Sequence, residues 1–293
     1  APLLARAMKE AARLGLPVHI HPEAGVSELP VWRDGNGGSP SGYRAFLESR
    51  PARAEEEAVR IALDLAGETG CALLLGPLTL PASLARVEAA RQQHGVRAAT
   101  AAAAHHLLFS EEDGAAAARS PLGERIVRAR PLPPLRPEAE RAALFEAARA
   151  HRIDLLLSGH AEGHGMRTAQ HAFPALLGRP DLAPETGPSP ERARLARHCG
   201  AEAAAFLGIA GRKGSIAVGK DADLCFLDLE EAVRAEAASL LYGERESLYA
   251  NQVVGGRVVR VLQRGRTLFA NGRMAKVVKG GEVCFIPREG NPG

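Results

Sequence analysis

The sequence predicts an α/β fold built on a parallel sheet and followed by a small β-rich unit. Amphipathic helical segments alternate with short apolar strand-like segments between residues 2 and 158. Beyond Gly211 the chain changes to short strand-like runs punctuated by glycine. The length of 293 residues is close to that of one (β/α) barrel, or of a smaller α/β domain with an appendage.

The alternation begins with a helical pattern that Gly15 and Pro17 end before an apolar run. Because strands joined by helices run parallel, repetition of this pattern predicts a parallel sheet with covering helices. The expected helices span residues 2–15, 50–70, 81–94 and 137–150. The expected strands span residues 18–20, 72–76, 96–102, 125–129 and 153–158.

The later part of the chain has a different pattern. Residues 192–209 are expected to form one helix closed by Gly208. The pair Asn271-Gly272 predicts a two-residue hairpin turn, since both central positions of that turn need a positive φ. We therefore expect two domains, an α/β domain over 1–210 and a small antiparallel β-rich unit over 211–293.

Composition excludes several classes of function. The net charge of +3 comes without a basic block interleaved with aromatic residues, so we expect no nucleic-acid partner. No apolar run is long enough to cross a bilayer and no cationic leader precedes one, which favours a cytoplasmic protein with no membrane partner. The cysteines lack CxxC spacing and are expected to be buried apolar fillers; they are Cys71, Cys199, Cys225 and Cys284.

Polar residues at the carboxyl ends of parallel strands are the first candidates for a site, because these ends form the mouth of a (β/α) barrel. His19 and His21 lie at the end of the first strand, where they form either a metal-binding pair or two hydrogen-bonded histidines. His105 and His106 follow the third strand; we expect adjacent histidines to face opposite ways, with a packing role. Arg136 follows a proline-rich loop, which it anchors unless it binds a substrate anion.

The segment after the fifth strand, SGHAEGH, brings together His160, Glu162 and His164. With His21 these groups include enough imidazole and carboxylate ligands for a zinc ion. The spacing is not the helical HExxH pattern, and a short loop can place the groups in many ways, so the pattern alone predicts little.

In order along the chain, these segments resemble the cyclic amidohydrolases, the group that contains allantoinase, dihydroorotase and hydantoinase. GLPVHIHPE resembles their "GLPV.VHAE", AHHLLFSEED their "PHHLLLTEED", and ARPLPPLRPEAERAALFEA their "K..PPLR....R.ALWEA". IDLLLSGHAEG resembles "ID.I.SDHAP", and LGIAGRKGSIAVGKDADLCFLD is very similar to their C-terminal segment. The segments SRP and AGRKGSIAVGKDADL resemble allantoinase more than dihydroorotase.

The resemblance implies a TIM-like (β/α) barrel of the amidohydrolase superfamily, incomplete at its N-terminus, with residues 211–293 completing a composite β-sandwich. It also implies a binuclear zinc site that hydrolyses a cyclic amide C–N bond. In this sequence His21 matches the histidine of "VHAE", but Pro77 and Gly159 fall where the family has a second histidine and the catalytic aspartate. His160 matches the neighbouring histidine, which makes it a candidate to bind substrate.

With His21 as the one remnant ligand, the resemblance predicts a degenerate relative with little hydrolytic activity. The alternatives are an active zinc hydrolase that uses His21, His160 and His164 on a small cyclic ureide or imide, a non-catalytic scaffold subunit, and a fragment of a longer enzyme. The incomplete β unit predicts a homo-oligomer or a complex with a different chain.

Overall fold

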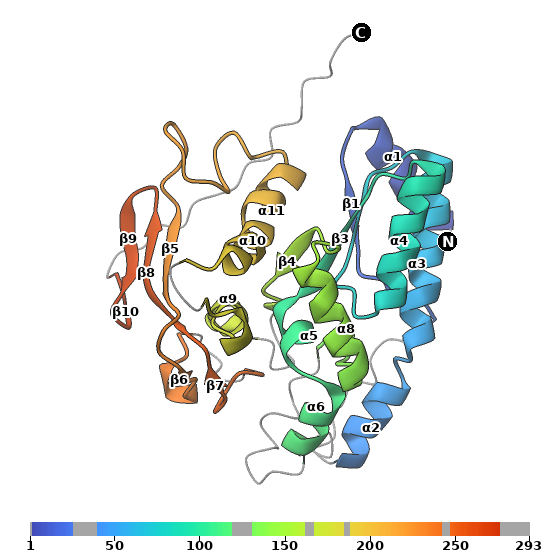
Figure 1. Ribbon diagram of the computed structural model, residues 1–293. Coiled ribbons are helices and arrows are strands. Elements are labelled where there is room, and N and C mark those ends of the chain that lie inside the picture. Colours follow the sequence, from blue (N-terminus) through green and yellow to red (C-terminus); the bar gives the residue numbers. More distant parts are fainter. Residues whose placement is uncertain are drawn as a thin grey trace. The chain divides into compact units, whose positions relative to one another are not determined.

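The structure is a computed structural model, and it describes residues 2–25, 40–118, 131–161, 167–184, 188–241 and 247–275. It forms two compact units, residues 1–167 with 246–248 and residues 168–245 with 249–293 (Figure 1). The first unit ends before the domain boundary expected between residues 210 and 211. The composite β-sandwich expected for residues 211–293 stays a prediction.

The first unit alternates helices and short strands as the sequence predicts. The expected strand over residues 125–129 lies outside the described residues. The described elements are α1 (Pro2–Arg13), β1 (Val18–Ile20), α2 (Pro40–Glu48), α3 (Ala52–Thr69), β2 (Leu73–Leu75), α4 (Pro81–His94), β3 (Ala98–Ala103), α5 (Ala104–Leu108), α6 (Glu111–Ala118), α8 (Glu138–Arg149) and β4 (Leu155–Leu157).

The four strands of this unit form one parallel sheet in the order β1-β2-β3-β4, which is also their order along the chain. The register pairs Val18 with Leu73, Leu73 with Ala98, and Ala101 with Leu155. Helices α1, α3, α4 and α8 lie on one face of the sheet (Figure 1). Sequential strand order with helices on a single face is the winding of a (β/α) barrel and not of a doubly wound sheet.

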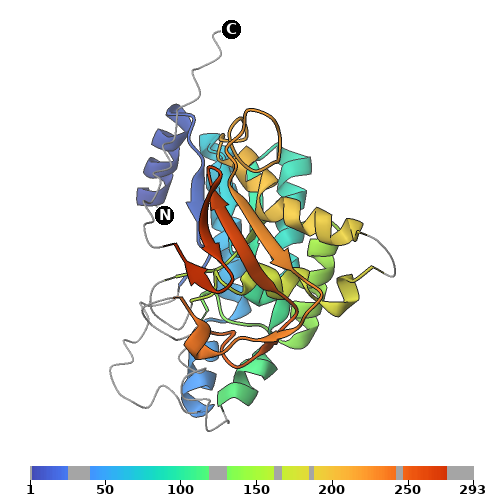
Figure 2. The ribbon, with the colours of Figure 1, turned by 90° about the vertical axis from the view of Figure 1, so that its left-hand side faces the viewer.

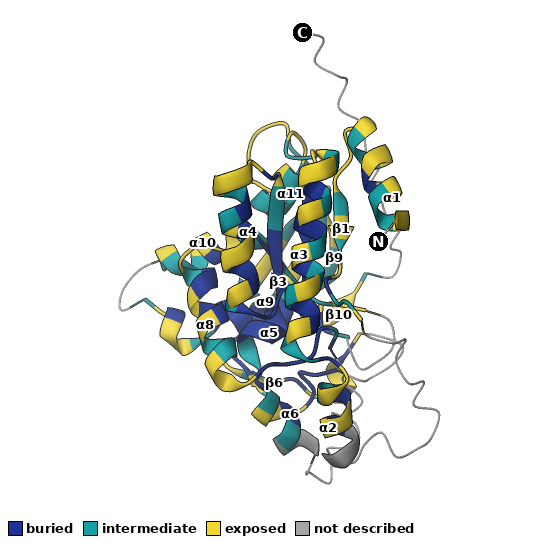
Figure 3. Cartoon of the chain, turned by 90° about the vertical axis from the view of Figure 1, so that its right-hand side faces the viewer, coloured by how far each residue is buried: buried dark blue, intermediate teal, exposed yellow. Residues whose placement is uncertain are grey.

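Local sequence explains why these elements begin and end where they do. Gly70 and Gly95 close α3 and α4 with φ of 67° and 63°, values that glycine adopts without a Cβ penalty. All three leucines of β2 are buried, as expected for a strand covered on both sides. Figure 3 shows β3 in dark blue between α3 and α4, whose outer surfaces are largely yellow. The buried face of each helix therefore packs toward the strands.

The second unit combines short helices with an antiparallel sheet. Strands β10, β9, β8 and β5 pair in that order, and β6 pairs with β7. Its elements are α9 (Ala172–Leu177), η1 (Pro180–Leu182), α10 (Pro190–Cys199), α11 (Ala201–Phe206), β5 (Leu224–Asp228), β6 (Val233–Arg234), η2 (Ala237–Ser239), β7 (Val253–Val254), β8 (Arg257–Gln263), β9 (Arg266–Ala270) and β10 (Arg273–Met274).

Two local predictions for this unit have different outcomes. The hairpin turn between β9 and β10 is confirmed, because Asn271 and Gly272 have φ of 49° and 78°. The single helix expected over 192–209 is wrong, since α10 ends before Gly200, whose φ and ψ of −135° and −67° are not helical. Helical periodicity continues across the break, so the pattern alone hides it.

The cysteines follow the expectation only in part. Cys71 is buried, Cys199 is partly buried and Cys225 is exposed, so Cys225 does not fill a core. Cys284 lies outside the described residues. Among the described helices, none combines the length and the apolar character that crossing a membrane requires.

Candidate functional site

The carboxyl ends of the four parallel strands carry most of the candidate residues. His21 follows β1, Gly76 and Pro77 follow β2, His105 and His106 begin the helix that follows β3, and Gly159 follows β4. Because the strands are parallel and adjacent, these positions lie along one edge of the sheet. This edge is the candidate site.

The two histidines of β1 bind different partners and do not pair with each other. The Nε2 atom of His19 lies 2.8 Å from the carbonyl oxygen of Gly76, so Nε2 carries the proton and donates it. The Nε2 atom of His21 lies 2.9 Å from the Oε2 atom of Glu23. Both rings are exposed. Each imidazole ring is therefore oriented by its own hydrogen bond, which it makes through Nε2.

Glu23 is a buried carboxylate that joins His21 to Arg50. The Nη1 atom of Arg50 donates to the same Oε2 atom at 2.8 Å, and both side chains are only 6% exposed. Burial by itself raises the pKa of Glu23, but hydrogen bonds from His21 and Arg50 and the charge of Arg50 outweigh it and hold the pKa below its usual value. Glu23 is therefore ionised near neutral pH, and Arg50 balances its charge.

The end of β2 has apolar groups where the family resemblance implies a metal ligand. Pro77 has no side-chain donor atom, and Leu78 is fully buried, with its amide donating to the carbonyl of Ala101 at 2.7 Å. A Cβ on Gly76 would lie 2.6 Å from the carbonyl oxygen of Ala101, so the backbones of β2 and β3 approach too closely for a larger residue. Gly76, Pro77 and Leu78 therefore offer no side-chain ligand for zinc.

A buried polar cluster lies directly behind this loop. Glu55, on α3, is fully buried and accepts hydrogen bonds from the amides of Thr79 and Leu80 at 3.1 Å and from the hydroxyl of Thr79. The Nε atom of Arg136 donates to the Thr79 hydroxyl at 2.9 Å, and its Nη1 atom donates to the carbonyl of Arg50 at 3.0 Å. These are the contacts of an anchoring residue. A role for Arg136 in substrate binding stays a prediction.

Burial dominates the electrostatics of this cluster. It raises the pKa of Glu55 even though the Thr79 hydrogen bond and the charge of Arg136 act in the opposite direction. The guanidinium of Arg136 lies 3.8 Å from the Glu55 carboxylate, and burial lowers the pKa of Arg136 as well. Both shifts have the same cause, the removal of two charges from water.

His105 and His106 are buried together, in a helix and not on a strand. Their ring centroids are 4.1 Å apart, so the expectation that they face opposite ways does not hold once α5 replaces extended backbone. The Nε2 atom of His106 donates to the carbonyl of Pro133 at 2.8 Å. Burial lowers the pKa of His106 to about 4 and that of His105 well below its usual value, which keeps both rings neutral near pH 7.

Gly159 and His160 follow β4. Gly159 has a φ of +66°, and a Cβ built on it would lie 2.3 Å from the Cε1 atom and 2.6 Å from the Nδ1 atom of His105. His160 is exposed, and its amide donates to the hydroxyl of Ser158 at 3.3 Å. Glu162 and His164 lie outside the described residues. The roles predicted for His160 in substrate binding and for His164 in metal binding therefore stay predictions.

The described residues at this edge do not by themselves supply the binuclear zinc site that the resemblance implies. Within the ranges that the structure describes, no three His, Cys, Asp or Glu side chains gather closely enough to hold a metal ion. A zinc hydrolase ordinarily supplies three protein ligands beside its water. Among the described histidines at this edge, His21 and His160 are exposed, and the Nε2 atom of His21 is bonded to Glu23.

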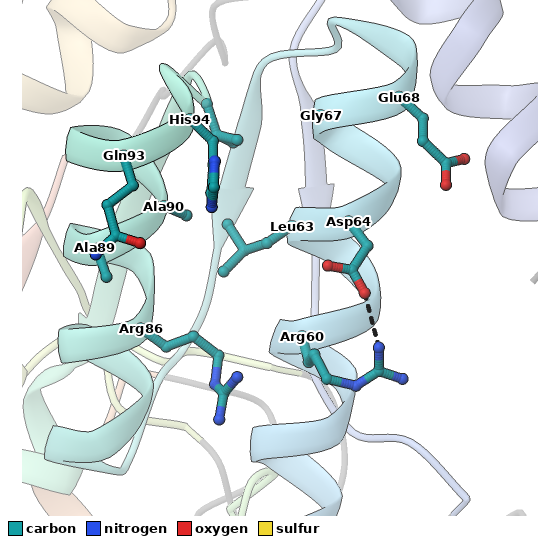
Figure 4. Close-up of a pocket in the computed structure, with 11 residues that line it drawn as sticks. Arg60, Leu63, Asp64, Gly67, Glu68, Arg86, Ala89, Ala90, Gln93 and His94 are labelled. Atoms are coloured by element: carbon teal, nitrogen blue, oxygen red, sulfur yellow. Dashed lines mark hydrogen bonds and ion pairs between the residues drawn. The ribbon is translucent and has the colours of Figure 1, made fainter.

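A hollow lies elsewhere in the first unit, between α3 and α4 (Figure 4). Its volume is 740 Å³, and its floor includes Leu63 while its rim carries Arg60, Asp64 and Arg86. Arg60 already pairs with Asp64 at 2.7 Å. The hollow faces away from the strand ends and mixes both signs of charge, so it offers no convergent group for chemistry.

The sequence placed Glu23 at the end of the first strand without predicting its partner, and it did not identify Arg50 or Glu55 as parts of this region. Glu55 begins a run of three glutamates near the start of a helix, a position typical of exposed carboxylates that favour the helix dipole. Its burial depends on the loop after β2 folding over it. Glu23 and Arg50 lie 27 residues apart, and neither carries a local pattern that predicts the pair.

Comparison with known proteins agrees with the strand winding. Residues 1–283 match the model of the amidohydrolase family. The chain is 35% identical to an allantoinase of Rubrobacter xylanophilus over 95% of its length, and 30% identical to an allantoinase of Solibacter usitatus over 96%. In each case it spans 61% of the relative.

Solved structures show the same fold. The L-hydantoinase of Arthrobacter aurescens superposes with a TM-score of 0.74 at 24% identity, covering 93% of this chain and 61% of that enzyme. A D-hydantoinase from Thermus sp. gives a TM-score of 0.73 at 20% identity, covering 92% and 60%. The parallel strands with their one-sided helices thus form part of a TIM-like barrel, and the chain belongs to the amidohydrolase family.

Proposed function

We propose that this chain is a relative of the cyclic-amide hydrolases whose own ring-opening activity has been lost. The observation that carries the proposal is the contact between His105 and Gly159. It leaves no volume for a side chain at the position where the resemblance implies the catalytic aspartate. Pro77 supports the same conclusion at the end of β2, where the resemblance implies a histidine ligand.

The chemistry explains why these two positions matter. A bound metal lowers the pKa of water enough for it to attack an amide carbon near neutral pH, and a carboxylate then accepts the proton. Here one position offers a ring without a donor atom and the other offers no side chain. His21 remains, held by Glu23 at 2.9 Å, but one imidazole binds a divalent ion only weakly.

The test is a combined measurement of metal content and ring opening. We expect the purified protein, after incubation with zinc and desalting, to retain far less than one zinc ion per chain. Inductively coupled plasma mass spectrometry measures the zinc content. The protein should open allantoin, hydantoin and dihydroorotate no faster than buffer, while the Rubrobacter xylanophilus allantoinase serves as the active control. Near-stoichiometric zinc with ring opening that His21→Ala, His160→Ala or His164→Ala abolishes would overturn the proposal in favour of an altered zinc site.

Association with another chain is the second candidate role, and one observation in the second unit favours it. No described helix or strand lies over the outer face of the sheet formed by β5, β8 and β9 (Figure 2). Phe226 is 44% exposed there, beside a shallow hollow of 430 Å³ that also involves Val259 and Ala270. Exposed apolar surface of this kind marks protein interfaces.

Light scattering after gel filtration tests this role directly. We expect a mass of at least twice 30.9 kDa, because a homo-oligomer or a partner chain would cover the apolar face. Phe226→Arg should shift the mass toward the monomer. Leu207→Arg is the matched control, because Leu207 is 40% exposed but does not line this hollow, and it should shift the mass less. A monomer across the micromolar range would exclude self-association and leave only a different chain as the partner.

A further inference from the structure

The ring of His105 lies in the space that a side chain at position 159 would need. It is 2% exposed, and neither ring nitrogen has a hydrogen-bond partner among the described residues. A Cβ on Gly159 would come within 2.3 Å of its Cε1 atom, whereas real Cβ contacts lie beyond 3 Å. Ala103, at the end of β3, lies on the same side, 3.1 Å from that Cβ position.

Two opposing effects act on this ring. A buried imidazole without partners loses the hydrogen bonds that water would provide, which disfavours its inward position. An empty volume at the end of the sheet would also be unfavourable, because its lining would lose van der Waals contacts. The ring therefore stays inside because it fills a void, and no described residue holds it there through a polar contact.

The backbone at Gly159 is altered as well. A φ of +66° is a conformation that residues with a Cβ adopt only with strain. Any side chain at 159 thus meets both an unfavourable backbone and an occupied volume. The lack of the aspartate that the family resemblance implies is therefore more than the loss of one side chain. The backbone conformation and the His105 ring also exclude a side chain at this position.

We propose that His105 and Gly159 form one linked change, in which the His105 ring plugs the carboxyl end of the sheet and determines whether residue 159 can carry a side chain. The proposal concerns the same site as the proposed loss of hydrolysis and rests on it for its functional meaning. Its physical content is a coupling between two residues, which stability measurements detect whether or not the protein hydrolyses anything.

A double-mutant cycle tests the coupling, with Gly70→Ala as the matched control. Gly70 has a φ of +67° but no atom within 4 Å of its Cβ position, so its substitution measures backbone strain alone. We expect Gly70→Ala to lower the melting temperature by about 3 °C and Gly159→Ala by about 8 °C, because the second change adds a steric clash. In a His105→Ala background, Gly159→Ala should cost no more than Gly70→Ala.

An equal cost of Gly159→Ala with and without the His105 ring would overturn the proposal. If His105→Ala does not fold, carbethoxylation of histidines followed by peptide mapping gives an independent readout. His105 should be protected in the parent protein and in Gly70→Ala, and modified severalfold faster in Gly159→Ala, where the new methyl displaces the ring. Unchanged protection in Gly159→Ala would show that the ring does not plug this position. Neither readout depends on zinc or ring opening, so this proposal and the proposed function can fail separately.

Discussion

Replacing Glu55 with alanine should lower the free energy of unfolding by about 3–5 kcal/mol, the range found when one partner of a buried ionic pair is removed. The change leaves the buried amides of Thr79 and Leu80 without their acceptor. It also leaves the Arg136 guanidinium without the carboxylate that lies 3.8 Å away. Urea unfolding followed by circular dichroism measures the loss.

Glu57→Ala is the matched control for this prediction. Glu57 lies on the same helix, is exposed, and pairs with Arg60 at 2.8 Å, a solvent-exposed ion pair that contributes little to stability. Loss of helix propensity or of net charge would affect both variants alike. If Glu55→Ala and Glu57→Ala unfold at the same urea concentration, the buried cluster does not stabilise the first unit.

Acidification should destabilise the protein well before its carboxylates are protonated. A histidine whose pKa is lowered by folding binds its proton more readily when unfolded, so stability is complete above about pH 6.5 and falls as the pH drops. For His106 the folded pKa is about 4, and the loss between pH 6.5 and 4 amounts to roughly 3 kcal/mol. The lowered pKa of His105 adds to the loss in the same direction.

Other charged groups modify this profile. The charges of Arg136 and His21 lower the pKa of His106 further, and that of Glu23 raises it. Glu55 acts in the opposite sense, since a raised carboxyl pKa gives stability at low pH that is lost as the pH rises. The net expectation is a lower urea midpoint at pH 5 than at pH 7. His106→Gln, which retains a donor for the Pro133 carbonyl, should flatten the difference; an unchanged pH dependence would contradict the assignment to His106.

Apolar periodicity and glycine placement predicted most of the first unit. The helix expected over 81–94 is α4, and the strand expected over 18–20 is β1, because both have a clear period and a glycine or proline at an end. The expected strand over 72–76 is shorter in the structure, since Gly76 already turns toward Pro77. Sequence patterns locate such elements well and their ends less well.

The candidate site was less predictable, because its contacts join distant segments. The family resemblance identified Pro77 and Gly159 as unusual, but nothing in the sequence indicated that the His105 ring lies against Gly159. The burial of Glu55 was equally hidden, since a glutamate near a helix start is ordinarily exposed. Side-chain packing at the strand ends depends on the three-dimensional approach of β2, β3 and β4, which periodicity does not encode.

The Glu55 cluster has a consequence for the order of folding. Its hydrogen bonds span 24 residues between Glu55 and Thr79, 57 between Thr79 and Arg136, and 86 between Arg50 and Arg136. Contacts of such long sequence separation require large loops to close before they form, and they are therefore late events. The pairings of β1 with β2 and of β2 with β3 close shorter loops than the contact between Arg50 and Arg136 does. Arg136 is therefore expected to join the cluster only after these strands have paired, so the loop behind the candidate site is fixed by a step that follows assembly of the barrel wall.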